Sequence, residues 1–307
     1  MADIFNYKEN QPIVWFHRMI ERSNQHCLYC GIYLGLNSGR ASNKEHLIGR
    51  EFVPSEYYQS TDFNFIFRCC IECNTKKSNI ERHLSTLTLL NSDSRLEDAK
   101  INELALRKAN KDYHPNNKGV LVIDSNIQRE IEFGDSIIRT KVGFVGPPQY
   151  KEDYVVELAF RHIQGLFSLL SSKNPLVSES TKLLSSEYFN VIGIYPKNDW
   201  GNKQIEYCVS KTECWRSCCN IVVANGYFRA LILQSTQESE ELFWALEWNK
   251  SIRILGAICD ESSFNNSYAD MPELLWSPWI KNSTGEYRFF AQTPLGSSSD
   301  RLFRKGD

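Results

Sequence analysis

Two pairs of cysteines, each with two residues between its members, constrain this chain more than any other feature of its sequence. The pairs are Cys27/Cys30 and Cys70/Cys73, and 39 residues lie between them. A tight turn at such a pair points both thiolates at one ion, and four thiolates complete a closed tetrahedral site. The spacing therefore predicts a structural zinc ion, which can hold together a segment too short to build its own core.

Two other uses of the four cysteines stay open from the sequence alone. They could form disulfides, although the first residues lack the features of a secretory signal, and we expect a cytoplasmic, reducing location. They could also organise a zinc ribbon that has no catalytic activity. Cys69 offers a competing register, but a ligand pair of Cys69 and Cys73 would leave Cys70 unused.

Polar residues between and after the cysteine pairs carry a more specific resemblance. Glu45-His46 lies between the pairs, Asn64 lies in the hydrophobic run that follows, and C-N-T-K-K begins at Cys73. Over residues 25–85, this arrangement resembles the HNH nuclease motif, also called the ββα-metal or His-Me finger. The resemblance implies two strands and a helix that carry a metal-dependent site for phosphodiester hydrolysis.

The resemblance also assigns roles to individual residues. Glu45 and Asn74 would hold a catalytic Mg²⁺ or Mn²⁺, His46 would activate the attacking water, and Asn64 would orient the imidazole, with Asn43 as the alternative for that last role. An imidazole suits the base because its pKa lies near neutrality, and Mg²⁺ prefers oxygen ligands. The zinc on the four cysteines would be structural and would take no part in the reaction.

DNA is the substrate that the resemblance implies. Because the net charge of the chain is −2, any affinity for DNA must come from a local group of basic residues. If a helix begins near Asn74, Lys77 shares its face, and we expect Lys77 to reach a phosphate. Lys76, Arg50 and Arg68 are the other expected contacts, although the two lysines could simply be a solvated helix start.

The whole chain predicts an α+β fold in three parts. We expect an HNH module with an N-terminal helix over residues 1–92, a helical linker over 93–118 and a mixed α+β domain over 119–307. Apolar spacing places the expected helices at residues 11–23, 74–90, 95–110, 154–170 and 240–249. The strands expected in the last part are at residues 120–123, 137–145, 189–195, 227–233 and 252–258.

Six of the seven tryptophans lie after residue 199. Trp244, Trp248, Trp276 and Trp279 could stack on bases, since an aromatic face accepts any base. Large aromatic side chains more often fill a core, and we favour that interpretation here.

The sequence thus predicts a metal-dependent HNH endonuclease whose residues 119–307 supply target choice, partner docking or autoinhibition. Such modules with appended regions resemble effectors of bacterial restriction and phage-defence systems, so the expected partners are DNA and proteins of such a system. No apolar run is long enough to span a membrane, and the oligomeric state is open. Two alternatives remain: a zinc-organised binding module without catalysis, and a nuclease triggered by a ligand in a C-terminal sensor domain.

Overall fold

The computed structural model describes most of the chain and combines helices with antiparallel sheets, in agreement with the expected mixture of α and β structure. The helix predicted over residues 11–23 lies outside the described residues. Among the helices of the described residues, none is both long and apolar enough to cross a membrane. The described residues are 26–35, 37–59, 62–114, 119–133, 140–146, 148–171, 183–236, 241–274, 276–282, 285–296 and 299–303.

Two short strands and a long helix open the described chain. β1 (Ser42–His46) pairs antiparallel with β2 (Ile66–Cys70), and α1 (Ile71–Leu90) follows β2 without a loop. The Cys70 thiol accepts a hydrogen bond from the N–H of Cys73 and thereby caps the helix. This junction fixes where α1 begins, and the helix predicted over residues 74–90 is confirmed with a slightly earlier start.

Two shorter helices follow α1. They are α2 (Ser94–Glu97) and α3 (Ala99–Ala109), and α3 packs against α1. The single helix predicted over residues 95–110 is broken at Asp98, because the Asp98 carboxylate accepts hydrogen bonds from the first N–H groups of α3. This cap starts a new helix with its own direction.

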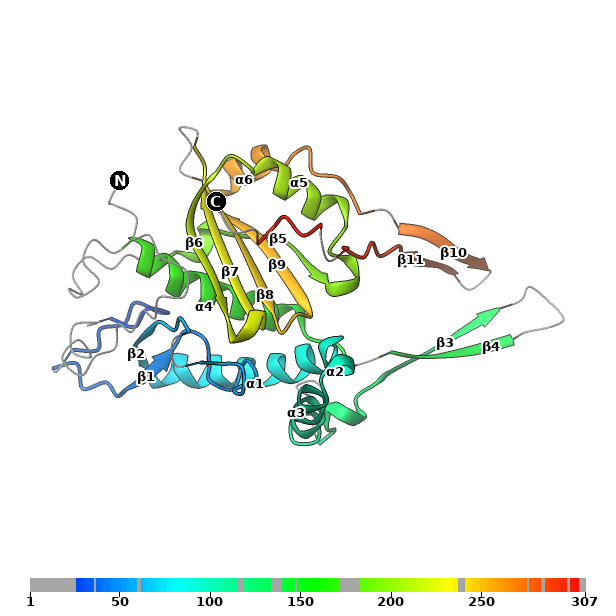
Figure 1. The fold of residues 1–307 in the computed structure, drawn as a ribbon, viewed down its shortest axis with the longest axis horizontal. Coiled ribbons are helices and arrows are strands. Elements are labelled where there is room, and N and C mark those ends of the chain that lie inside the picture. Colours follow the sequence, from blue (N-terminus) through cyan, green and yellow to red (C-terminus); the bar gives the residue numbers. More distant parts are fainter. Residues whose placement is uncertain are drawn as a thin grey trace.

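Two hairpins extend away from the body of the molecule (Figure 1). One consists of β3 (Ile127–Phe133) and β4 (Thr140–Gly146), and the other of β10 (Trp276–Asn282) and β11 (Gly285–Phe290). Each pair forms its own two-stranded antiparallel sheet.

A five-stranded antiparallel sheet forms the centre of the C-terminal half. Its strands lie in the order β5-β9-β8-β7-β6, and every neighbouring pair is antiparallel. The strands are β5 (Phe189–Pro196), β6 (Arg216–Val223), β7 (Phe228–Gln234), β8 (Leu242–Trp248) and β9 (Ile252–Ile258). The helices around it are α4 (Glu152–Ser171), α5 (Lys203–Lys211) and α6 (Glu261–Ser267).

Both faces of this sheet are covered, and β8 shows the consequence for its sequence. Trp244 and Trp248 belong to the core on the α4 side, whereas Phe243 and Ala245 belong to the core on the α5 side. A strand buried on both faces has a nearly continuous apolar sequence and no polar alternation. The helix predicted over residues 240–249 is therefore wrong, and the interpretation of Trp244 and Trp248 as core residues is confirmed.

The larger core runs across the predicted boundary between the N-terminal module and the C-terminal domain. It contains Leu47 and Leu84 from the first part, Leu158 of α4 and Trp248 of the sheet. Figure 1 shows α4 between the five-stranded sheet and α1. The segment with the cysteine pairs is thus built onto α4, and the two parts share one hydrophobic interior.

Phe52, on the loop after β1, provides a test of this shared core. Its side chain is 1% exposed, and its ring lies 5.5 Å from the Trp248 ring and 5.6 Å from the His162 ring. We expect Phe52→Ala to lower the free energy of unfolding by about 3–5 kcal/mol in urea denaturation. Leu96→Ala, at a side chain that is 79% exposed, is the control, and an equally small effect of both variants would contradict the shared core.

Candidate functional site

The four cysteines of the two pairs converge, as their spacing predicted. The sulfur atoms of Cys27, Cys30, Cys70 and Cys73 all lie within 4.8 Å of one another. Zinc–sulfur bonds of about 2.3 Å in a tetrahedron need about 3.8 Å between sulfur atoms, and the Cys30 and Cys70 sulfur atoms are 3.8 Å apart. The thiol donors and their spacing therefore fit a metal ion such as zinc.

Cys69 lies beside this cluster without belonging to it. Its thiol is 3.5 Å from that of Cys27 and 3.3 Å from the backbone oxygen of Cys70, and the side chain is fully buried. The set of thiols that converge mutually contains Cys70 and omits Cys69. The competing register is therefore disfavoured by the geometry.

Lys77 is the centre of a buried charge network behind the cluster. Its ammonium nitrogen lies 2.7 Å from Glu45 Oε1 and 2.7 Å from Glu81 Oε1, and it donates to the backbone oxygen of His46. Burial alone would lower the pKa of Lys77, but the carboxylates of Glu81 and Glu45 outweigh burial and raise this pKa. The ammonium group therefore stays charged and ties β1 to α1.

The expected contact between Lys77 and a DNA phosphate is contradicted by this burial. Its side chain has no exposed surface, and both of its ionic partners are internal carboxylates. Lys77 shares a helix face with Asn74, as the spacing predicted, but the face turns towards the interior at Lys77. Glu81, one turn further along α1, continues the same buried face and supplies the second negative charge.

Lys77 and Tyr29 both contact the same carboxylate oxygen of Glu45. Its Oε1 meets the Lys77 ammonium and lies 3.4 Å from the Tyr29 hydroxyl, and the residue is 6% exposed. Burial raises the pKa of Glu45, and the positive charge of Lys77 offsets only part of that effect. Among the described residues, both contacts of Glu45 fall on Oε1, so Oε2 is the oxygen left for a cation.

His46 ends β1 and is only half-buried, unlike Glu45 before it. Successive side chains of a strand point to opposite faces, so the imidazole lies on the other side of β1 from the Glu45 carboxylate. Burial, together with the positive charges of Arg50 and Lys44, lowers the pKa of His46 to about 4. At neutral pH the imidazole is therefore uncharged, and it is a weaker base than the imidazole of near-neutral pKa that the sequence led us to expect.

Two asparagines support the backbone around His46. Asn64 is 7% exposed, and its amide both accepts a hydrogen bond from the N–H of Ile48 (3.2 Å) and donates to the Ile48 oxygen (3.0 Å). Asn64 thus braces the loop that follows His46, where direct orientation of the ring was expected. Asn74 lies in the first turn of α1, with its amide nitrogen 3.5 Å from the backbone oxygen of Lys44.

Residues of α4 contact Lys76 and Glu81 of α1, and the sequence did not predict these contacts. Glu157 pairs with Lys76 (3.0 Å) and with Arg161 (2.6 Å), and His162 lies 3.6 Å from Glu81. Burial lowers the pKa of His162 to about 4, so this imidazole is neutral in the core. The Glu157/Arg161 spacing of one helical turn was the only sequence signal, and it could not reveal partners in α1.

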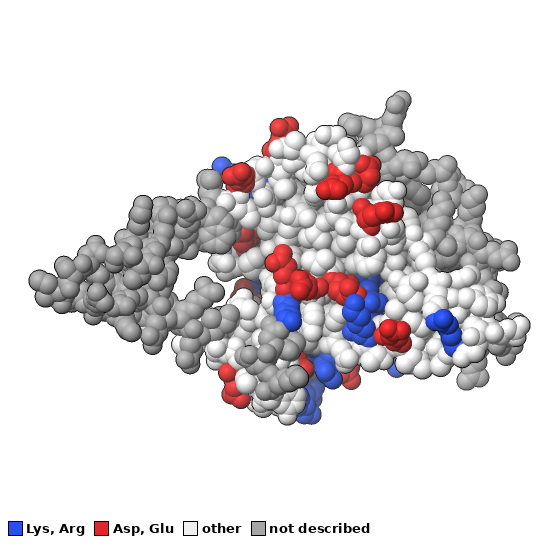
Figure 2. Space-filling view, turned by 180° about the vertical axis from the view of Figure 1, so that it is seen from behind, with Lys and Arg blue, Asp and Glu red and all other residues white. Residues whose placement is uncertain are grey.

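The remaining residues expected to contact DNA differ in their exposure and in their bonds to other side chains. Arg50 is exposed, Lys76 is 59% exposed but paired with Glu157, and Arg68 donates to the Ser42 hydroxyl. Figure 2 shows that, on the face drawn there, most basic side chains lie in the lower half with acidic ones among them. Any attraction for DNA on that face would therefore be local.

Comparisons of the chain with models of protein families, with curated proteins and with solved structures found no match. The expected site residues fall into two groups. The first is the four-cysteine cluster, which converges and can hold a metal ion such as zinc. The second is Glu45, His46 and Asn74, which lie where β1 meets the first turns of α1, with the His46 and Glu45 side chains on opposite faces of β1.

Zinc content tests the first group directly. We expect about one zinc ion per chain in wild type, from a closed set of four thiolates. Cys70→Ser should lose the zinc and much of the stability, since the ion joins parts of the chain far apart in sequence. Cys214→Ser, at an exposed cysteine outside the cluster, should keep both, and equal zinc loss in the two variants would contradict the assignment.

The charge network gives a second test. Lys77→Met keeps an unbranched side chain but leaves two buried carboxylates without their cation, and we expect it to lower the free energy of unfolding by about 3–5 kcal/mol. Lys76→Met is the matched control on the adjacent, largely exposed side chain, with an expected change of about 1 kcal/mol or less. Chemical denaturation of both variants would refute the network if Lys77→Met were as stable as its control.

Proposed function

We propose that residues 27–90 carry the active site of a metal-dependent DNA endonuclease of the HNH type. The observation that carries the proposal is the position of the half-buried His46 at the end of β1, two residues after Lys44, whose backbone oxygen lies 3.5 Å from the amide nitrogen of Asn74 on α1. The order of two strands and a helix, with a four-cysteine cluster at the same corner, supports it.

The chemistry follows from these groups. His46 accepts the proton of a water molecule and makes it a nucleophile for the phosphorus atom of a DNA phosphodiester. A bound Mg²⁺ or Mn²⁺ would supply positive charge to the phosphate and to the leaving oxygen. Asn74 and the free oxygen of Glu45 are the oxygen donors that would hold this cation, in keeping with the ligand preference of Mg²⁺.

Two further residues act by positioning in this proposal. The Lys77 ammonium group binds Glu45 Oε1 and the backbone oxygen of His46. One group therefore fixes the positions of both residues. Asn64 fixes the loop after His46 through both of its bonds to Ile48. Arg50 is the exposed candidate for a contact with the DNA backbone, and Lys76 could contribute only in competition with Glu157.

A second candidate function is a zinc-organised binding module without catalysis. The burial of Glu45 against Lys77 favours it, because the ammonium group already neutralises this carboxylate. Such a module would bind its partner equally well with His46 replaced. Docking to other proteins of a defence system, or activation by a ligand, remains a prediction for either candidate.

Plasmid nicking distinguishes the two candidates. We expect wild type to nick supercoiled DNA with Mg²⁺ or Mn²⁺, and His46→Ala to lose this activity by a factor of about 10² or more because the base is gone. His114→Ala, a histidine outside the site, is the matched control and should nick like wild type. Zinc content and unfolding should be unchanged in both variants.

Nicking that survives in His46→Ala would contradict the proposed base. If neither protein nicks, and both bind DNA with the same affinity, the module is a binder. A chelator should abolish nicking before it removes the tightly held zinc, so zinc has to be measured in the same samples.

A further inference from the structure

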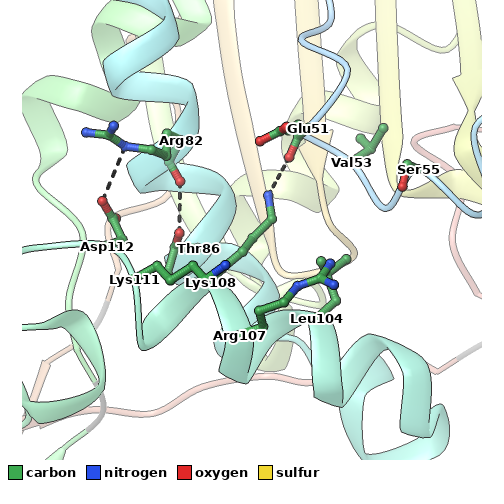
Figure 3. Close-up of a pocket in the computed structure, with 10 residues that line it drawn as sticks. All are labelled: Glu51, Val53, Ser55, Arg82, Thr86, Leu104, Arg107, Lys108, Lys111 and Asp112. Atoms are coloured by element: carbon green, nitrogen blue, oxygen red, sulfur yellow. Dashed lines mark hydrogen bonds and ion pairs between the residues drawn. The ribbon is translucent and has the colours of Figure 1, made fainter.

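A second site lies on the other side of α1 from the cysteine cluster. It is a cavity of about 360 Å³ between α1, α3 and the loop after β1. Figure 3 shows its basic side chains, Arg82 from α1 and Arg107, Lys108 and Lys111 from α3 and its end. Arg107 and Lys108 lie in the last turn of α3, and Lys111 follows two residues after its end.

The charges that line the cavity do not balance. The four basic side chains face only two acidic residues, Glu51 and Asp112. Asp112 is already engaged, since it lies 3.4 Å from Arg82 and 2.9 Å from His83. The lining therefore has an excess of positive charge.

Lys108 shows this excess most clearly. Its ammonium group donates to the backbone oxygen of Glu51 and to the Ser85 hydroxyl (2.8 Å), both of which are uncharged acceptors. No carboxylate of the described residues lies within 4.0 Å of it. Burial lowers the pKa of Lys108 to about 8, and the carboxylate of Glu51 offsets only part of this. An anion in the cavity would favour the charged form and accept a hydrogen bond from its remaining N–H.

Arg107 and Lys111 are available for the same anion. Both are exposed, and in the described part of the chain neither forms an ion pair. Basic residues near the end of a helix are favoured by the helix dipole. The dipole, however, explains neither a partly buried Lys108 without a counter-charge nor Arg82, which comes from a different helix.

We propose that this cavity binds a phosphate group carried by a ligand of nucleotide size. Arginine and lysine side chains together suit a phosphate, because the guanidinium offers two parallel N–H groups and the ammonium a point charge. The volume is at the lower end of the range for small-molecule sites. Val53 and Leu104 supply an apolar wall on which a sugar or base can lie.

The phosphate can come from a free nucleotide or from the end of a DNA strand, because both present the same group. The proposal does not depend on nuclease activity, since it concerns residues outside the proposed active site. Binding without turnover is therefore the appropriate measurement.

The variants follow from the contacts. Arg107→Ala/Lys111→Ala removes two charges from exposed side chains and should leave the fold intact. Arg95→Ala/Lys100→Ala removes the same charge from α2 and α3 outside the cavity and is the matched control. Circular dichroism and thermal unfolding of both variants confirm that the fold is kept.

Two probes separate the sources of the phosphate. Calorimetric titration with ATP at physiological ionic strength reports a free nucleotide, and fluorescence anisotropy compares an oligonucleotide with and without a 5′-phosphate. We expect the cavity variant to weaken ATP binding by about tenfold or more, or to abolish the preference for the phosphorylated end, with the control variant like wild type.

Loss of ATP binding assigns the cavity to a nucleotide, and loss of the end preference assigns it to a strand terminus. The proposal is overturned if wild type shows neither form of binding. It is equally overturned if the control variant weakens binding as much as the cavity variant, because the effect would then be one of net charge.

Discussion

The convergence of four thiols on one point is the constraint on which the N-terminal part of this structure depends. The cluster joins the turn at residues 27–30 to the junction of β2 and α1, parts that are distant in the sequence. The Cys70 thiol also caps α1, so the same residue sets the position of the cluster and the first turn of the helix. The position of that turn then decides where Asn74 and Lys77 lie relative to β1.

Lys77 connects this corner to the rest of the molecule. It binds Glu45 of β1 and Glu81 of α1, and Glu81 in turn lies beside His162 of α4. Removing one partner of such a buried network leaves an uncompensated charge, so the network favours a single arrangement of the three elements. The C-terminal half is therefore part of the support of the candidate site, in addition to any role in target choice or partner docking.

Much of the site could be predicted because its signals are local. The two-residue spacing of the cysteines specifies a turn, and the α1 and α4 helices follow from apolar spacing within each helix. The inward direction of Lys77 could not be predicted, since it depends on Glu45 and on an α4 helix far along the chain. β8 was misassigned for a related reason: its apolar sequence reflects a sheet covered on both faces, which periodicity cannot distinguish from a buried helix.

A direct test of the account is whether a second metal site exists beside the four-cysteine cluster. Electron paramagnetic resonance titration with Mn²⁺ of the zinc-loaded protein reports this without any DNA. We predict that wild type and Asn79→Ala, a change at an exposed position of α1, bind one Mn²⁺ and keep their zinc, whereas Asn74→Ala binds Mn²⁺ much more weakly. Mn²⁺ binding that is absent from wild type, or unchanged in Asn74→Ala, would contradict the proposed catalytic site.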